Sequence, residues 1–281
     1  MSDYQLGVIG AGNMAEALLR GVTGGGRVPR RDKSRRGSPF LPAKVIVASD
    51  PAAERRRLLS YELGVACVED NAVPAGCPRV VLAVKPQVMP KVLEGVSAAV
   101  RPDALVITIA AGVTTSLLDQ KLKGKGRIVR VMPNTPMLVG EGMSAVAAGP
   151  RATDDDLKWT CKLFGSGGQT VGVSEAMMDA VTAVSGSGPA YFFYLIEAMT
   201  AAGVAEGLPA DVAALLARHT CAGAARMLIE SGQPPEALRS RVTSPGGTTQ
   251  RAIETMDAAG VKDAIVKAVR AAAQRSRELD S

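Results

Sequence analysis

Aromatic residues and histidine are both scarce in this sequence. Phe, Trp and Tyr together make up 3% of the 281 residues, whereas hydrophobic residues as a whole make up 47%. A core must therefore be built from Ala, Val, Leu and Ile. His219 is the single histidine, and it falls inside an expected helix, where partial burial is its ordinary role. The composition thus argues against a reaction that depends on a histidine base.

Cysteine is also sparse. Cys67, Cys77, Cys161 and Cys221 are widely spaced and form no CxxC pair. With one histidine they cannot complete a usual zinc set, so we expect no metal. Unpaired cysteines are typical of reduced thiols, and the chain enters an apolar run almost at its first residue, so we expect a cytoplasmic protein without a signal peptide. The longest uncharged run, residues 180–196, is shorter than a spanning helix, so we expect no membrane segment.

Charge is concentrated in one segment. The formal net charge is +6, and much of the excess lies between residues 27 and 36. This stretch belongs to a segment rich in Gly, Arg and Pro, residues 24–43, which we interpret as an inserted loop. No aromatic residues interleave with the basic ones and no nucleic-acid motif is present. We therefore expect a solvated basic loop and no nucleic-acid partner.

A glycine turn stands close to the N-terminus. The apolar residues 6–9 lead into the sequence GAGNMA, residues 10–15, and a helix pattern follows. Gly10 permits a tight turn, Gly12 lets a pyrophosphate approach the backbone, and Ala15 lets the helix pack on the strand. The pattern of strand, glycine turn and helix predicts dinucleotide binding.

The next strand, residues 44–49, ends at Asp50. A carboxylate there can accept hydrogen bonds from the adenosine ribose, which favours NAD. Ser49, Arg55 and Arg56 lie close enough in sequence to hold the 2′-phosphate of NADP instead. Asp50 can also be a simple N-cap for the helix that follows. The sequence leaves these alternatives open.

Strands alternate with helices through residues 1–175, which predicts a parallel, doubly wound sheet of Rossmann type. A capping box at residues 153–156 predicts the start of one helix. The expected strands are residues 6–9, 44–49, 79–84, 105–108, 127–131, 142–148 and 169–173. The expected helices are residues 14–21, 54–63, 88–100, 116–122 and 157–164. Ligands of such sheets bind beyond the strands' carboxyl ends, which here carry small, polar or proline residues at 10–15, 49–50, 83–86, 109–111 and 132–136.

The pattern changes after Glu175, and residues 176–281 are expected to form an all-helical domain. The expected helices are residues 176–184, 189–206, 210–230, 236–241, 249–259 and 262–278. Residues 191–196 and 212–217 are apolar nearly all round, and a small helical domain cannot bury both runs alone. The sequence therefore predicts an α/β domain followed by an all-α dimerisation domain, with interlocked helices in a homodimer.

The sequence SPGGTT, residues 244–249, lies between two amphipathic runs. Gly246 and Gly247 leave these two positions free to adopt left-handed angles, and Thr248 or Thr249 can then cap the following helix. Backbone N–H groups and hydroxyls would then gather at a helix N-terminus, which suits a carboxylate or phosphate. An ordinary Pro-Gly turn is the alternative.

Six motifs together resemble the pyrroline-5-carboxylate reductase family: GAGNMA, AVKP, IAAGV, MPNTP, SGSGPAY and VTSPGGTT, in this order. The resemblance covers the chain except the basic insert. It implies that NADPH or NADH reduces 1-pyrroline-5-carboxylate, a small imino acid, to L-proline in the last step of proline biosynthesis. It also implies a homodimer that assembles into larger rings, with an active site between one subunit's nucleotide domain and its partner's helical domain.

The resemblance also implies which residues form the site. The cofactor should be lined by Ile9, Gly10, Ala11, Gly12, Asn13, Met14, Asn71, Ala83, Val84, Lys85, Pro86, Ile109, Ala110 and Ala111. The substrate should be surrounded by Glu175, Ser244, Gly246, Gly247, Thr248 and Thr249. Glu175 has an alternative role as a carboxylate at a helix start. Asp50 stands where some members carry Ser, which leaves the choice between NAD and NADP open.

Thr249 is the candidate catalytic residue, because its hydroxyl can orient the imine nitrogen or relay a proton. A hydroxyl is too weak an acid to be a lone general acid, so a water or the substrate would supply the proton. Two rival functions remain. A related β-hydroxyacid or imine reductase would be expected to carry a catalytic lysine in its helical domain, and the long helix after Pro189 contains none. A non-enzymatic dinucleotide sensor would not need the cluster at 244–249.

Overall fold

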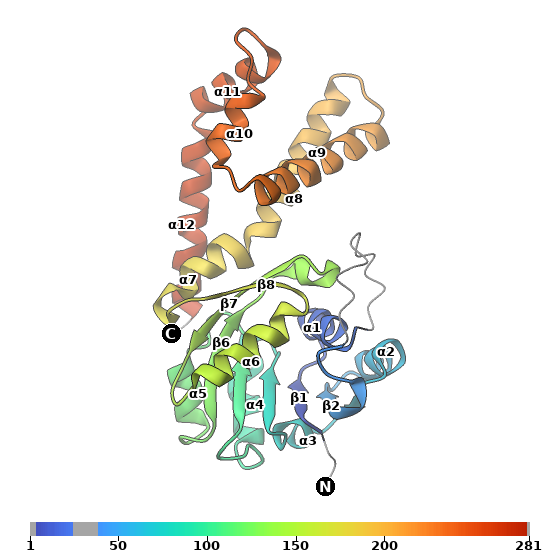
Figure 1. Cartoon of the computed structure of the whole chain (residues 1–281), viewed down its shortest axis with the longest axis vertical. Coiled ribbons are helices and arrows are strands. Elements are labelled where there is room, and N and C mark those ends of the chain that lie inside the picture. The colour runs from blue at the N-terminus through green and yellow to red at the C-terminus, as the bar shows by residue number, and fades with distance from the viewer. Residues whose placement is uncertain (1–3, 25–38, 280–281) are drawn as a thin grey trace. The chain divides into compact units, whose positions relative to one another are not determined.

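The computed structural model describes residues 4–24 and 39–279 (Figure 1). The chain divides into two compact units, one of residues 1–187 with 272–281 and one of residues 188–271. The basic residues 27–36, interpreted above as a solvated loop, lie outside the described residues. The domain boundary expected after Glu175 stays a prediction.

The first unit is built on an eight-stranded sheet in the order β3-β2-β1-β4-β5-β6-β7-β8 (Figure 1). Its strands are β1 (Leu6–Ile9), β2 (Ile46–Ser49), β3 (Ala66–Val68), β4 (Arg79–Leu82), β5 (Leu105–Thr108), β6 (Arg127–Met132), β7 (Gly142–Ala148) and β8 (Gly168–Gly172). All neighbours are parallel except β6 and β7. The all-parallel prediction is therefore wrong at β7. The link from β6 to β7 is too short for a crossover helix and folds into a 3₁₀ turn, η4 (Thr135–Val139), which reverses the chain.

Helices cover both faces of this sheet, so the doubly wound prediction is confirmed. One core cluster packs α1 (Asn13–Thr23), α2 (Ala53–Leu63) and α6 (Asp154–Gly165) on one face. The other packs α3 (Ala72–Ala75), α4 (Met89–Val96) and α5 (Thr115–Lys121) on the opposite face. Strand residues alternate between the clusters, as the period of two requires: Val8 joins the first and Ile9 the second.

The predicted capping box at the start of α6 is confirmed. The Thr153 hydroxyl accepts from the Asp156 N–H, and the Asp156 carboxylate accepts from the Thr153 N–H. The same carboxylate accepts from Arg127 Nε at 2.7 Å and Nη2 at 3.0 Å. Burial opposes the charge, but Arg127 and Thr153 outweigh it and hold the pKa of Asp156 below its usual 3.8. One carboxylate thus joins the start of α6 to the start of β6.

Asp156→Asn is therefore expected to lower the free energy of unfolding at pH 7 by about 2 kcal/mol, the scale of a hydrogen bond to a charged group. Because the folded pKa lies below the unfolded one, the stabilisation is complete above about pH 4 and is lost as pH falls through the folded value. Urea unfolding at pH 7 and at pH 3, at one protein concentration, checks this.

The matched control is Asp155→Asn, because Asp155 is on the same turn with 91% of its side chain exposed. It should change stability by less than about 0.5 kcal/mol. The role given to Asp156 would be contradicted if both variants lowered the free energy of unfolding equally. It would also be contradicted if the difference in this free energy between Asp156→Asn and the unmodified chain were as large at pH 3 as at pH 7.

The second unit has helices joined by short turns and no strand among its described residues. It contains α8 (Gly188–Ala205), α9 (Ala210–Ser231), α10 (Pro235–Arg241) and α11 (Thr248–Ala258), and α12 (Val261–Leu279) begins in it and ends in the first unit. The helix expected at residues 176–184 is instead a 3₁₀ turn η5 (Glu175–Met177), α7 (Met178–Val181) and a π-turn η6 (Thr182–Gly186).

Apolar side chains of α8 and α9 are left exposed by the single chain, including Phe192, Phe193, Tyr194, Leu215 and Leu216. His219 is exposed on α9, so the expectation that it is partly buried is wrong for the single chain. Among the described residues, α9 is one helix that is long and apolar enough to cross a membrane. Helices of soluble proteins pass the same test of length and composition. The exposed apolar surface of α8 and α9 is what the predicted dimerisation requires.

Candidate active site

The glycine turn lies between β1 and α1. Gly10 has a φ of +96°, and a Cβ there would lie 2.8 Å from the Ala83 carbonyl oxygen, so only glycine fits. Gly12 is the N-cap of α1, and no described side chain caps this helix. A Cβ on Gly12 would meet no described atom within 4 Å. The turn therefore presents the amino end of α1 to open space, which fits the pyrophosphate of a dinucleotide.

Four strand ends meet beside this turn. Backbone hydrogen bonds join Gly10 N–H to the Ser49 carbonyl, Ala83 N–H to the Ile9 carbonyl and Ile109 N–H to the Leu82 carbonyl. The loops after β1, β2, β4 and β5 therefore leave the sheet at one edge. Chain order reverses between β1 and β4, which is where ligands bind in doubly wound sheets.

The structure thus brings together most of the predicted cofactor residues. At this edge lie the last residues of β1 and β2, the loops that follow the four strands, and the first residues of the helices after them: Ile9, Gly10, Ala11, Gly12, Asn13, Met14, Ser49, Asp50, Ala83, Val84, Lys85, Pro86, Ile109, Ala110 and Ala111. Asn71 joins them from the loop after β3, because the buried Ser49 hydroxyl donates to its Oδ1 at 2.7 Å. The Ser49 hydroxyl proton is therefore already used in a hydrogen bond to Asn71.

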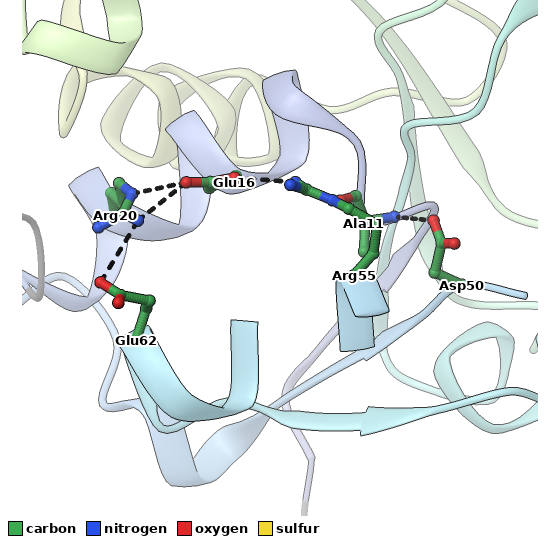
Figure 2. A network of polar contacts seen from close by, with 6 residues as sticks. All are labelled: Ala11, Glu16, Arg20, Asp50, Arg55 and Glu62. Carbon is green, nitrogen blue, oxygen red and sulfur yellow. Dashed lines mark hydrogen bonds and ion pairs between the residues drawn. The ribbon is translucent and has the colours of Figure 1, made fainter. Parts of the chain in front are cut away.

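Asp50 acts on the glycine turn itself. Its Oδ2 accepts from the Ala11 N–H at 2.8 Å, and its Oδ1 accepts from the Ala52 N–H at 2.9 Å (Figure 2). The N-cap of α2 is Ala52, so the interpretation of Asp50 as that cap is wrong. Asp50 instead joins the end of β2 to the glycine turn.

Both arginines considered for a 2′-phosphate have other partners. Arg55 Nε donates to the Ala11 carbonyl at 2.7 Å, and its Nη2 donates to Glu16 at 2.8 Å (Figure 2). Arg56 donates to the carbonyls of Asp50 and Pro51 and to Glu69. Glu16 was missed by the sequence analysis, although its position four residues before Arg20 could have indicated an ion pair.

Asn134 holds the loop after β6. Its amide nitrogen lies 3.2 Å from the Ser185 carbonyl, to which it donates, and its Oδ1 accepts from the Met143 N–H at 2.9 Å. The MPNTP loop is thereby tied to the start of the SGSGPAY segment. This contact gives the two motifs a common structural role.

The Glu175 carboxylate is engaged within the first unit. It accepts from the Thr115 backbone N–H at 2.8 Å and from the Thr115 hydroxyl at 2.5 Å, and Arg130 Nη1 lies 3.4 Å away. These contacts join the start of η5 to the start of α5 and to β6. The substrate role implied for Glu175 stays a prediction.

The SPGGTT segment forms a turn at the start of α11. Gly246 is left-handed with a φ of +70°, whereas Gly247 has a φ of −83°, so only the first of these two glycines uses the left-handed freedom. Gly247 is the N-cap and no described side chain caps the helix, so the predicted cap by Thr248 or Thr249 is wrong. The first-turn N–H groups of α11 lack intrahelical acceptors, as at any helix start.

Gln250 also shapes this turn, although the sequence analysis did not single it out. Its Oε1 accepts from the Gly246 N–H at 2.7 Å, and its Nε2 donates to Glu254 at 2.7 Å. The Gly247 N–H donates to the Ser244 carbonyl. Two of the N–H groups assigned above to an anion are therefore satisfied within the turn, which leaves those of Thr248 and Thr249 and their hydroxyls to bind one.

Known proteins match this chain over nearly its whole length. A family model described as pyrroline-5-carboxylate reductase dimerisation matches residues 175–279, and one described as NADP oxidoreductase, coenzyme F420-dependent, matches residues 5–112. The pyrroline-5-carboxylate reductase of Pseudomonas aeruginosa is 41% identical over 281 residues, which cover 99% of this chain and 98% of the relative. That of Methanosarcina acetivorans is 40% identical over 280 residues, with 99% of both chains covered.

Solved structures of pyrroline-5-carboxylate reductases have the same fold as this chain. The pyrroline-5-carboxylate reductase of Coxiella burnetii superposes with a TM-score of 0.85 at 34% identity, with 99% of both chains covered. The Plasmodium falciparum enzyme, solved with NADP bound, also gives 0.85, at 29% identity over the full length of both chains.

The sheet, its glycine turn and the helical C-terminal part define an NAD(P)-dependent oxidoreductase with a dimerisation domain. The chain belongs to the pyrroline-5-carboxylate reductase family. The predicted family, fold class, cofactor class and reaction class, reduction of a C=N bond with NAD(P)H, are confirmed. The match to a dimerisation domain supports an oligomer, and membership of this family supports a small-molecule substrate.

Proposed function

We propose that this chain reduces 1-pyrroline-5-carboxylate to L-proline, the last step of proline biosynthesis. The observation that carries the proposal is the full-length likeness to reductases of this name, at 41% identity with 98% of the relative covered. The structure supports it with a dinucleotide-type turn at Gly10 and Gly12 and with the SPGGTT turn at the start of α11.

The substrate is a small cyclic imine with one carboxylate. The N–H groups and hydroxyls of Thr248 and Thr249 are suited to hold that carboxylate, and the dipole of α11, an 11-residue helix, adds attraction for a negative charge. Ser244, Gly246 and Gly247 shape the turn that presents these groups. Reduced nicotinamide supplies a hydride for the imine carbon, and the nitrogen must end protonated.

Thr249 is proposed to orient the imine nitrogen or relay its proton. It is half-buried as the second residue of α11, and no hydrogen bond engages its hydroxyl among the residues that the structure describes. We expect the larger contribution to the rate to come from holding the nicotinamide and the imine in the correct relative position, because positioning alone removes much of the barrier to a bimolecular reaction.

The proposal includes the assembly and the compartment. The chain forms a homodimer through its helical part, and the dimers assemble into a larger ring. It works in the cytoplasm, without a nucleic-acid or membrane partner. Exposed apolar residues of α8 and α9, with the match to a dimerisation domain, support the dimer.

The experiment that tests the function is an absorbance assay. Purified protein is given 1-pyrroline-5-carboxylate with NADH or NADPH, and oxidation is followed at the nicotinamide band. Turnover to proline is the expected result. A folded protein that binds either cofactor but shows no turnover would contradict the proposal and favour a sensing role.

Asp50 is proposed to favour NADH over NADPH. Asp50→Asn removes the charge that would accept from the ribose and repel a 2′-phosphate. The ratio of kcat/KM for NADH to that for NADPH should fall about tenfold, the lower end for one charge-assisted hydrogen bond. The same absorbance assay with both cofactors measures this ratio.

The matched control is Asp70→Asn, because Asp70 makes the same carboxylate bond to the N–H two residues ahead, at 2.8 Å from Ala72. It should leave the ratio unchanged. If Asp50→Asn lowers both kcat/KM values equally, Asp50 acts only by holding the turn at Ala11.

A further inference from the structure

The glycine turn is gripped at one residue from two sides. The Ala11 N–H donates to Asp50, and the Ala11 carbonyl accepts from Arg55 Nε at 2.7 Å (Figure 2). A negative and a positive side chain thus hold the same peptide segment beside the amino end of α1. Arg55 lies five residues after Asp50, close to where a dinucleotide's adenosine ribose is expected.

Glu16 fixes the far end of Arg55. Its Oε2 accepts from Arg55 Nη2 at 2.8 Å, and its Oε1 accepts from Arg20 Nε at 3.0 Å and Nη2 at 2.9 Å. The Glu16 side chain is 14% exposed and that of Arg55 26% exposed, so water screens this pair only in part. Burial opposes the charge of Glu16, but the two guanidinium groups outweigh it and hold its pKa below the usual value. Glu16 is therefore ionised at neutral pH.

The arrangement matters because of what a 2′-phosphate would need. Such a group carries about −1.5 to −2 charges and is best bound by a guanidinium with free N–H groups. Here Asp50 adds a negative charge nearby, Arg56 is committed to two carbonyls and Glu69, and Arg55 is committed to Ala11 and Glu16. The positive charge nearest the turn is thus already paired.

We propose that Glu16 is a specificity-determining residue, which holds Arg55 on the glycine turn and so keeps it from serving the 2′-phosphate of NADP. Two carboxylates then discriminate between the two cofactors. Asp50 favours the unphosphorylated ribose of NAD, and Glu16 keeps the Arg55 guanidinium from binding the 2′-phosphate of NADP. This inference rests on the proposed use of a nicotinamide dinucleotide, and it is independent of which imine is reduced.

The test is a pair of dissociation constants, for NAD⁺ and NADP⁺, measured by calorimetry on the full chain at one fixed ionic strength. Glu16→Gln keeps the size and an acceptor oxygen but removes the charge. The ratio of the NADP⁺ constant to the NAD⁺ constant should fall about tenfold, the scale of one charge-assisted hydrogen bond gained by the phosphate. A merely structural role would weaken both cofactors and leave the ratio unchanged.

The matched control is Glu62→Gln. Among the described residues, Glu62 contacts the same network only through Arg20, at 3.6 Å, and its side chain is 41% exposed. It removes an equal charge without touching Arg55, and its ratio should stay within about twofold of the unmodified chain.

A second variant separates Arg55 from the rest of the network. Arg55→Met alone should leave the ratio unchanged, because the held guanidinium contributes nothing to the phosphate. Adding Arg55→Met to Glu16→Gln should abolish the shift. The inference is overturned if Glu16→Gln leaves the ratio unchanged, if the shift persists without Arg55, or if Arg55→Met alone selectively weakens NADP⁺. If the unmodified chain binds neither cofactor, the proposed function itself fails.

Discussion

Thr249→Ala should lower kcat by about 10²-fold, the low end for loss of a group that assists proton transfer. The substitution removes a hydroxyl from the second residue of α11 and leaves the backbone N–H groups of the turn in place. Carboxylate binding should therefore persist, so KM should change much less than kcat. Steady-state kinetics with 1-pyrroline-5-carboxylate and a saturating cofactor measure both.

The control is Thr255→Ala, in the same helix. The Thr255 hydroxyl donates to the Arg251 carbonyl at 2.8 Å, so this variant removes an equal group from α11 away from the turn. Its kcat should stay within about twofold of the unmodified chain. Thr249→Ser keeps the hydroxyl and should retain most activity. A near-normal kcat in Thr249→Ala would remove this residue from the catalytic step and leave it as part of the turn.

The fold was predictable to the extent that local patterns specify it. Neighbouring strand residues such as Val80 and Val81 are buried on opposite faces of the sheet. The strands are therefore short, continuous apolar runs, which can be recognised in the sequence. β3 was missed because its three residues, Ala66–Val68, are half-buried and one of them is Ala, which has a weak strand preference. The antiparallel β7 could have been predicted, since the link after β6 is too short for a crossover.

The site was predictable where backbone geometry demands a residue type. Gly10 is required by its positive φ and by its approach to Ala83, so it carries a signal in the sequence. Arg55 and Glu16 are 39 residues apart, and their contact exists only because α1 and α2 pack on the same face of the sheet. No local pattern contains that information. The cap expected at Thr248 or Thr249 failed for a related reason, because Gly247 and Gln250 already organise the turn.

The apolar character of helix α8 could also be predicted from the sequence. Phe192, Phe193, Tyr194 and Leu195 are consecutive and are 59%, 64%, 76% and 46% exposed. Four consecutive residues point to all sides of a helix, so the single chain leaves α8 uncovered around most of its circumference. The family match assigns this region to dimerisation, and a second copy of the chain would cover these side chains.

Phe193→Asp should therefore weaken self-association by about 10³-fold or more. Burying an unpaired carboxylate costs several kcal/mol, and a two-fold symmetric interface contains the substitution twice. Phe193 is exposed in the single chain, so its loss leaves the chain's own core intact. Sedimentation velocity over a range of concentrations measures the association, and circular dichroism checks that the helices remain.

Tyr61→Asp is the control, because Tyr61 on α2 is 89% exposed and lies outside the dimerisation match. It makes the same aromatic-to-aspartate change and should leave association unaltered. A Phe193→Asp protein that remains associated at nanomolar concentration would place the interface elsewhere. If it instead dissociates and loses turnover together, while the Tyr61 variant keeps both, the reaction depends on the assembled form, as expected where a partner's helical domain completes each site.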